Sequence, residues 1–290
     1  MNHLEFDEVV KSYLVHFGTK NNSELGGEHR GKRYMHILDI PKGKTKENIV
    51  KESNLLPEIK ELPWIPFKLQ SCAHHLNSSQ IMCYNFFRRF IDNNGKPSKQ
   101  LVEILHDYCH LLEYHNNAKC KFEYIENDVA EKTNFDFYIE SGGIKVYCEI
   151  KYTEPSFSKS GGGQNPSKQF MEIYKPFIDS NKDLWKREIT EKDVMKDYYQ
   201  LFRNAMRANT EGKYVLFICP KDREDLEKDF MEFKDKFLKK EGLIRYVYWE
   251  DLISKAKSQN VNMDSFENKY FGYKEWYSST SPTHTAGIER

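Results

Sequence analysis

The sequence lacks several features that would place it in a specialised class. Its six cysteines include no C-x-x-C pair, which argues against a redox motif and predicts reduced thiols in the core. No apolar run approaches the roughly 20 residues that a membrane-spanning helix needs. The N-terminus lacks the order of basic, apolar and small residues that is typical of a secretion signal. We therefore expect a cytoplasmic protein with no membrane partner.

An excess of one charge is also missing, because 44 Lys and Arg residues balance 44 Asp and Glu residues. Any nucleic-acid contact must then come from a locally basic face. A phosphate-binding loop is excluded as well, since the glycine-rich stretch 161–168 lacks the G-x-x-x-x-G-K-[ST] spacing. We interpret that stretch as a mobile flap near an active site.

The overall amino-acid composition is that of an ordinary globular protein. The 290 residues are 39% apolar, 30% charged and 14% aromatic, which suits one large domain or a core with an appended arm. We expect an N-terminal arm or subdomain at residues 1–70, a core at 71–275 and a C-terminal tail at 276–290. The arm carries the basic stretches 29–38 and 40–48, which are candidates for DNA contact or plain solvated loops.

The order of patterns along the core predicts an α/β fold, a mixed β-sheet flanked by α-helices. Apolar residues recur first at helical spacing and then at every second position, and after that helical and strand patterns follow each other. The expected elements are helices 78–90 and 98–115, strands 120–126, 134–140 and 144–152, helix 195–209, strand 213–220, helix 222–240 and strand 243–252. Helix 98–115 is expected to turn Tyr108 and Leu111 inward. Gly142 and Gly143 predict a hairpin between the second and third strands.

Charged residues interrupt the two strands of this hairpin. Alternation places Glu149 and Lys151 on one face of the second strand. On the first strand it sends three apolar residues to the opposite face, Phe135, Phe137 and Ile139. It leaves Asp136 on the face of Glu149, so antiparallel pairing brings the two carboxylates together.

Two close carboxylates repel each other unless a cation lies between them. This pair suits a hard divalent ion such as Mg²⁺, which binds one or two carboxylates and a phosphate substrate. The adjacent Lys151 can orient and help deprotonate the attacking water and offset charge on the phosphorus. The hairpin therefore predicts a phosphodiesterase site.

These residues resemble the motif of the PD-(D/E)XK nuclease superfamily, an acidic residue on one strand followed by an acid-x-lysine triplet on the next. Asp136 and the triplet 149–151 match it. Further short sequence segments resemble those of a bacterial branch of restriction-endonuclease-like proteins in that superfamily. These segments are 133–136, 149–154, 78–80, 84–86 and 200–204. The resemblance covers residues 71–255, and its one visible departure is Phe135 in place of the proline that often precedes the first acid.

The resemblance implies a restriction-endonuclease-like core and a Mg²⁺-dependent endonuclease that hydrolyses DNA, of the restriction or defence type. It implies that Asp136 and Glu149 ligate Mg²⁺, for which Mn²⁺ would substitute, that the carbonyl of Ile150 joins them, and that Lys151 acts on the water. It also suggests a companion methyltransferase. Because double-strand cleavage usually needs two active sites, a homodimer is expected.

Supporting residues are less sharply defined. Gln200, Arg203, Asn204 and Arg207 form a polar stripe on helix 195–209, which is either a solvated face or a site in which Gln200 approaches the acids and Arg203 or Arg207 holds a phosphate.

Three more residues have alternative interpretations. Gln80 either caps its helix or reaches the metal waters, and Glu103 competes with it for that role. Glu154 is either an acid behind the metal ligands, a second-metal ligand or a polar turn residue.

Other interpretations compete with the nuclease. The triplet alone fits a solvated strand face with a weak ion pair. A catalytically silent nucleic-acid-binding protein, or a nuclease acting on RNA or structured DNA, would keep the same fold. His106 and His110 near Cys109 and Cys120 invite a zinc site, but no second paired-ligand knuckle accompanies them.

Overall fold

The computed structural model describes residues 1–40, 49, 54–60, 68–126, 132–157, 165–208, 212–239 and 242–280. Its strands are β1 (Leu25–His29), β2 (Lys32–Leu38), β3 (Lys119–Ile125), β4 (Asn134–Ser141), β5 (Ile144–Ile150), β6 (Lys213–Cys219) and β7 (Ile244–Tyr248). Its helices are α1 (His3–Lys20), α3 (Pro57–Lys60), α4 (Ser79–Phe87), α5 (Lys99–His106), α6 (Pro166–Gln169), α7 (Lys175–Ser180), α8 (Tyr199–Ala205), α9 (Glu224–Phe237), α10 (Trp249–Ser258), α11 (Asp264–Phe271) and α12 (Tyr273–Thr280). Short 3₁₀ or π segments lie at Arg88–Phe90, Phe170–Tyr174, Lys182–Leu184 and Asp193–Asp197.

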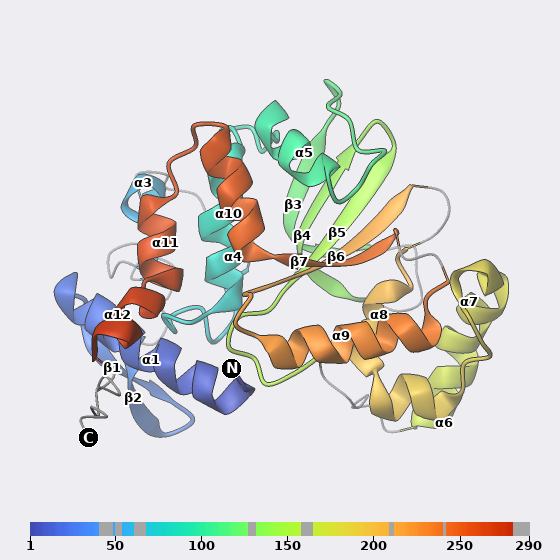
Figure 1. The fold of residues 1–290 in the computed structure, drawn as a ribbon, viewed down its shortest axis with the longest axis horizontal. Coiled ribbons are helices and arrows are strands. Elements are labelled where there is room, and N and C mark those ends of the chain that lie inside the picture. The colour runs from blue at the N-terminus through green and yellow to red at the C-terminus, as the bar shows by residue number, and fades with distance from the viewer. Residues whose placement is uncertain are drawn as a thin grey trace, which may run out of the picture.

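A five-stranded sheet in the order β3-β4-β5-β6-β7 forms the centre of the fold (Figure 1). The pairs β3–β4 and β4–β5 are antiparallel, whereas β5–β6 and β6–β7 are parallel. The predicted mixed sheet between helices is therefore confirmed, and it is consistent with a restriction-endonuclease-like core. The β4–β5 turn is also as predicted, since Gly142 and Gly143 have φ of +60° and +85° and Ser141 pairs with Ile144.

Each face of the sheet is covered by its own apolar core. One core joins Phe137, Val146 and Ile150 to α1, α4, α5, α10 and α11, and the other joins Tyr138, Tyr147 and Phe217 to α8, α9 and the segment 170–195. Figure 1 shows the two helix layers on opposite sides of the strands. Because both faces are buried, a solvated strand face is excluded for β5.

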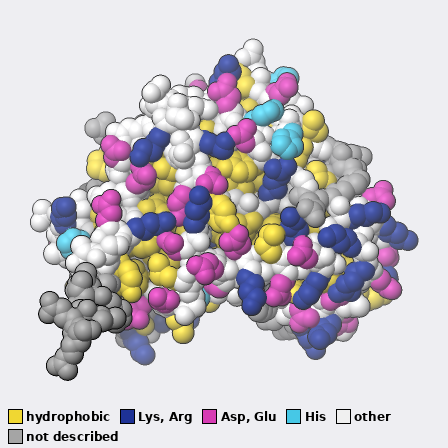
Figure 2. Space-filling view, in the orientation of Figure 1, with side chains coloured by type: hydrophobic (Ala, Val, Ile, Leu, Met, Phe, Trp, Pro, Cys, Tyr) yellow, Lys and Arg dark blue, Asp and Glu magenta, His cyan; other side chains and the backbone are white. Residues whose placement is uncertain are grey.

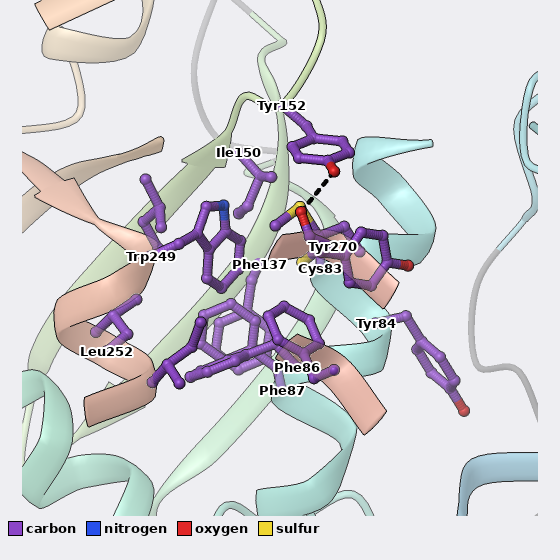
Figure 3. Close-up of a cluster of buried hydrophobic side chains, with 14 of the residues drawn as sticks. Cys83, Tyr84, Phe86, Phe87, Phe137, Ile150, Tyr152, Trp249, Leu252 and Tyr270 are labelled. Atoms are coloured by element: carbon purple, nitrogen blue, oxygen red, sulfur yellow. Dashed lines mark hydrogen bonds between the residues drawn. The ribbon is translucent and has the colours of Figure 1, made fainter. Parts of the chain in front are cut away.

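The first core fixes the strands that carry the candidate site. In Figure 3 Phe86 and Phe87 of α4 lie in one cluster with Phe137 of the sheet, and the ring of Phe87 stacks on that of Phe137 with centroids 3.9 Å apart. Beyond the end of β5, the hydroxyl of Tyr152 donates to the carbonyl of Tyr270 over 2.7 Å. The residues directly beside Asp136 and Lys151 are thus held by close packing.

The expected helix 98–115 is wrong in its second half. Helix α5 ends at His106, and the ring Nδ1 of His106 lies 2.9 Å from the carbonyl of Leu112. The chain then continues in turns, which leaves Leu111 59% exposed although its spacing predicted an inward position. Propensity and spacing favoured a longer helix, but the chain turns back at His106, where this local contact replaces further helical hydrogen bonding.

Helix α1 was not predicted in the arm 1–70. It runs for 18 residues with Asn2 as its N-cap and buries Phe6, Val10 and Leu14 in the first core. The ring of Phe6 meets Tyr152 edge-on at 5.9 Å. The predicted arm therefore shares a core with the strands that carry the acids.

The expected C-terminal tail and the expected loops compare with the structure as follows. The expected tail 276–290 begins inside α12, which continues to Thr280. The basic stretch at 41–48 and the glycines of the expected flap at 161–163 lie outside the described residues. Within the described helices none is long and apolar enough to cross a bilayer.

Candidate active site

Asp136 lies where the pairing of β3, β4 and β5 is interrupted. The β4–β5 ladder runs from Ser141 to Phe137, which pairs with Cys148, and it stops before Asp136. The side chain of Asp136 continues the connection in place of the backbone, because its Oδ2 accepts a 2.7 Å hydrogen bond from the amide of Ile150. The carboxylate is therefore held beside the residue that separates Glu149 from Lys151.

This interruption explains one wrong prediction. Phe135 was expected to share the core of Phe137, but it lies in the opposite core and packs against Tyr147 with ring centroids 5.1 Å apart. Alternation holds only for regular strands. Phe135 and Phe137 lie on the two sides of Asp136 and pack in different cores, so alternation is broken between them.

Glu149 and Lys151 are neighbours on one face of β5, as alternation predicted. Lys151 Nζ lies 3.4 Å from Glu149 Oε1, and the two residues are only 6% and 8% exposed. Such buried charges are costly unless they are paired or bind an ion. The pair is therefore far from the weak surface ion pair that the triplet alone would suggest.

The pKa values of Asp136 and Lys151 are both raised, for different reasons. Burial, and then the nearby Glu149 carboxylate, raise the pKa of Asp136 well above its ordinary value, against the hydrogen bond from Ile150. Burial alone would lower the pKa of Lys151, but the surrounding carboxylates, first that of Glu149, outweigh it and raise that pKa. The site thus has a surplus of negative charge that a divalent cation would relieve.

Helix α8 supports the acids from the second core. Gln200 Nε2 donates to Glu149 Oε1 over 2.5 Å, so the predicted approach of Gln200 to the acids is present in the structure. One turn later Asn204 is fully buried, and neither its oxygen nor its nitrogen has a hydrogen-bond partner among the described residues. Buried polar atoms of this kind are usually satisfied by water or a ligand.

The two arginines of this helix have different surroundings. Arg207 is 4% exposed, and its Nε lies 3.6 Å from Glu126 Oε2. Arg203 is half-buried with its guanidinium 5.6 Å from the ring centre of Tyr199, and its Nε has no hydrogen-bond partner within the described chain. Of the two alternatives for this stripe, the solvated face is excluded, because Gln200, Asn204 and Arg207 are buried, and Arg203 stays the better candidate for a phosphate contact.

Three other predicted residues contact different groups. Both ends of the Gln80 amide bind the preceding loop, since Oε1 accepts from the amide of Gln70 and Nε2 donates to the carbonyl of Lys68. Glu103 is exposed on α5 and pairs with Lys99 at 3.3 Å. Neither contact brings Gln80 or Glu103 to the acids.

Glu154 lies closer to the site. Its carboxylate accepts from the amide of Tyr152 and contributes to the raised pKa of Lys151.

A third acid, Glu123 on β3, was missed by the sequence analysis. Phe122 pairs with Phe137 and Tyr124 with Phe135, so Glu123 and Asp136 face each other across the strands. Glu123 has φ of +49°, and its charge also raises the pKa of Asp136. The available signal was a charged residue at the centre of strand 120–126, at the level of the interrupted pairing.

The zinc alternative at His106 and His110 is not supported by their contacts. His106 binds the carbonyl of Leu112, and the Nε2 of His110 lies 2.9 Å from Nη2 of Arg245. Cys109 is fully buried.

Surface charge is mixed over the face seen in Figure 2. Lys and Arg side chains gather over the region of α6, α7 and the end of α9, with Asp and Glu among them. Lysines of these helices pair with acids, as in Lys168–Glu172 at 3.8 Å and Lys175–Asp179 at 3.2 Å. This region is therefore less positive than its lysines alone suggest.

Comparison with known proteins agrees with the sheet and its buried charges. A family model described as "Restriction Endonuclease associating with ARP" matches residues 14–271, which include the whole central sheet and all the acids discussed above. No curated protein and no solved structure gives a significant match. The match spans most of the chain, so the protein belongs to this family of restriction endonucleases.

Proposed function

We propose that the protein is a Mg²⁺-dependent DNA endonuclease of the PD-(D/E)XK type. The observation that carries the proposal is the joint placement of three side chains at one interrupted end of a hairpin. Asp136 accepts from the amide of Ile150, and Glu149 lies 3.4 Å from Lys151. Membership of a restriction-endonuclease family supports DNA as the substrate.

Asp136 and Glu149 are the residues that would hold Mg²⁺, with the carbonyl of Ile150 as a further proposed ligand. The ion supplies positive charge beside the scissile phosphate. The donor set fits it, because the site joins carboxylate oxygens, and burial together with the nearby Glu149 charge already raises the pKa of Asp136.

The chain's own residues then have distinct tasks. Gln200 fixes one oxygen of Glu149, which orients that carboxylate. Lys151 is an ammonium next to this oxygen and can orient the attacking water and stabilise negative charge that develops on phosphorus. Hydrolysis forms one phosphorus–oxygen bond to water and breaks one ester bond to the departing nucleotide.

The test is cleavage of duplex DNA, with and without base modification, in the presence of Mg²⁺ or Mn²⁺. We expect Asp136→Ala, Glu149→Ala and Lys151→Ala each to lose at least about 100-fold in cleavage rate, with unchanged circular dichroism. Glu103→Ala is the matched control, because its exposed carboxylate pairs with Lys99 on the surface of α5, and it should cleave normally.

Full activity in any of the three variants would refute the assignment. Metal-independent DNA binding without cleavage by the unaltered chain would instead favour a silent binding protein. Cleavage of RNA or of structured DNA alone would retain the site but change its substrate.

A homodimer and a companion methyltransferase complete the proposal. Cutting both strands in one event needs two copies of the site, so we expect the cleaving species to be a dimer when its mass is measured on DNA. Protection of the DNA by prior methylation would identify the substrate modification that the companion enzyme supplies.

A further inference from the structure

A second group of potential metal ligands lies in the N-terminal part of the molecule. One ring nitrogen each of His29 and His75 and the thiol of Cys72 all lie within 4.8 Å of one another. The three residues are partly exposed. His29 ends strand β1, and the other two belong to the turn before α4.

Backbone contacts fix this arrangement. The β1–β2 turn has φ of +52° at Arg30 and +77° at Gly31, which aligns His29 with Lys32. In the turn before α4, the amide of His75 donates to the carbonyl of Cys72 over 3.0 Å.

Strand β2 connects the two segments. The amide of Leu38 donates to the carbonyl of His74 over 3.1 Å, and the amide of Leu76 donates to the carbonyl of His36 over 3.0 Å. The ligand atoms therefore approach each other on a hydrogen-bonded frame rather than through flexible side chains alone.

One of these three side chains has a buried nitrogen without a partner. His75 Nε2 makes no hydrogen bond to any residue of the described chain and is inaccessible to solvent. The thiol of Cys72 is not in a disulfide, and the Ser71 hydroxyl lies 3.9 Å from its sulfur. An unsatisfied imidazole beside a free thiol points to a missing ligand.

We propose that His29, Cys72 and His75 bind one transition-metal ion of the Zn²⁺ class. Two imidazoles and a thiolate select Zn²⁺ over Mg²⁺, which prefers oxygen ligands. Donor atoms of tetrahedral zinc lie roughly 3.5 Å apart, so small side-chain rotations would close the group from its present spacing. Because the three residues are partly exposed, water can occupy the fourth position.

The ion would have a structural role. It would connect the β1–β2 hairpin to the turn that leads into α4, and α4 carries Phe87 against the active-site strand. This binding is chemically separate from the carboxylates of Asp136 and Glu149, so either site can be present without the other.

The test uses the full chain stripped of metal by a chelator and titrated with Zn²⁺ or Co²⁺. We expect one tight Zn²⁺ per chain, a thiolate-to-cobalt charge-transfer band, and a higher melting temperature with Zn²⁺. Loss of a residue behind a metal ligand already costs about 10–100-fold in affinity. Cys72→Ser, His29→Ala and His75→Ala should therefore each lose at least about 100-fold, and Cys72→Ser should abolish the band.

Cys120→Ser and His110→Ala are the matched controls, since one removes another partly exposed thiol and the other a surface imidazole. Both should bind Zn²⁺ like the unaltered chain. Absence of the charge-transfer band in the unaltered chain would overturn the proposal, as would its survival in Cys72→Ser. Loss of tight Zn²⁺ binding in Asp136→Ala but not in Cys72→Ser would place the ion at the carboxylates instead.

Discussion

The two faces of the central sheet differ in what they bury. Against α4 and α10 the sheet presents a largely apolar surface, with Phe137 and Ile150 in contact with aromatic rings (Figure 3). Towards α8 it presents Glu149 and Lys151, and Glu149 accepts a hydrogen bond from Gln200 of that helix. Buried charge costs free energy unless it is compensated. We therefore assign the buried charges on the α8 side of the sheet to catalysis and the apolar contacts on the α4 side to the stability of the fold.

The apolar face should respond most strongly to substitution. Phe137→Ala removes the ring that stacks on Phe87 and is expected to lower the free energy of unfolding by about 3–5 kcal/mol. Chemical denaturation measures this change. Cleavage should fall only in proportion to the unfolded fraction, and a folded Phe137→Ala protein with no activity would contradict the division between the faces.

The polar face should lose activity with little loss of stability. Gln200→Ala releases one oxygen of Glu149 and should lower cleavage about 10–100-fold, as loss of a residue behind a metal ligand does. The rate as a function of Mg²⁺ concentration measures it.

A double-mutant cycle with Glu149→Gln sharpens this prediction. The loss caused by Gln200→Ala should vanish once Glu149 is replaced, because the two residues act through one hydrogen bond. Additive losses would show that Gln200 acts elsewhere. Leu201→Val, a neighbouring change in the apolar core, is the control and should retain activity.

Asp136→Asn should raise stability while it removes activity. The pKa of Asp136 is raised in the folded state, so without divalent ions the native stability falls as pH rises from the ordinary carboxyl pKa of about 4 through the raised value. Asparagine cannot ionise and still accepts from Ile150, so we expect a gain of about 0.5–2 kcal/mol at neutral pH.

Melting curves across pH test this expectation. The advantage of Asp136→Asn over the unaltered chain should grow with pH and shrink when Mg²⁺ is added. An advantage that is constant with pH would mean that the charge of Asp136 is not the cause.

Glu123→Gln should have the smallest effect. It removes a charge that helps to raise the pKa of Asp136, so the acidic limb of the pH–activity profile should move to lower pH by less than about 1 unit. A large loss of Mg²⁺ affinity would instead make Glu123 a metal ligand. Glu140→Gln, on β4 and paired with Lys119, is the control and should leave the profile unchanged.

Strong local patterns were sufficient to predict much of the sheet and part of the site. The turn at Gly142 and Gly143, the pairing of β4 with β5 and the shared face of Glu149 and Lys151 follow from glycine conformation and alternation. The inward side chains of α9 were also predicted correctly, namely Leu226, Phe230, Phe233 and Phe237. These features depend on residues that are close in sequence.

Other features depend on contacts between distant residues. Helix α5 ends where Arg245 donates to the carbonyl of Asp107 and Lys255 pairs with the carboxylate of Asp107, and the polar stripe of α8 is buried because it meets the charges of β5. Neither the spacing nor the helix propensity of a segment identifies its tertiary partner, so spacing predicted too long a helix at α5 and left the place of the α8 stripe open.

The sequence by itself determined that an acid and an acid-x-lysine triplet stand on adjacent antiparallel strands, because alternation and a glycine turn are local properties. Only the tertiary structure decided that the ladder breaks at Asp136, that Glu123 faces it, and that His29 lies beside Cys72 and His75. Those relations join segments of the chain that backbone hydrogen bonds and core packing bring together, and no local pattern encodes them.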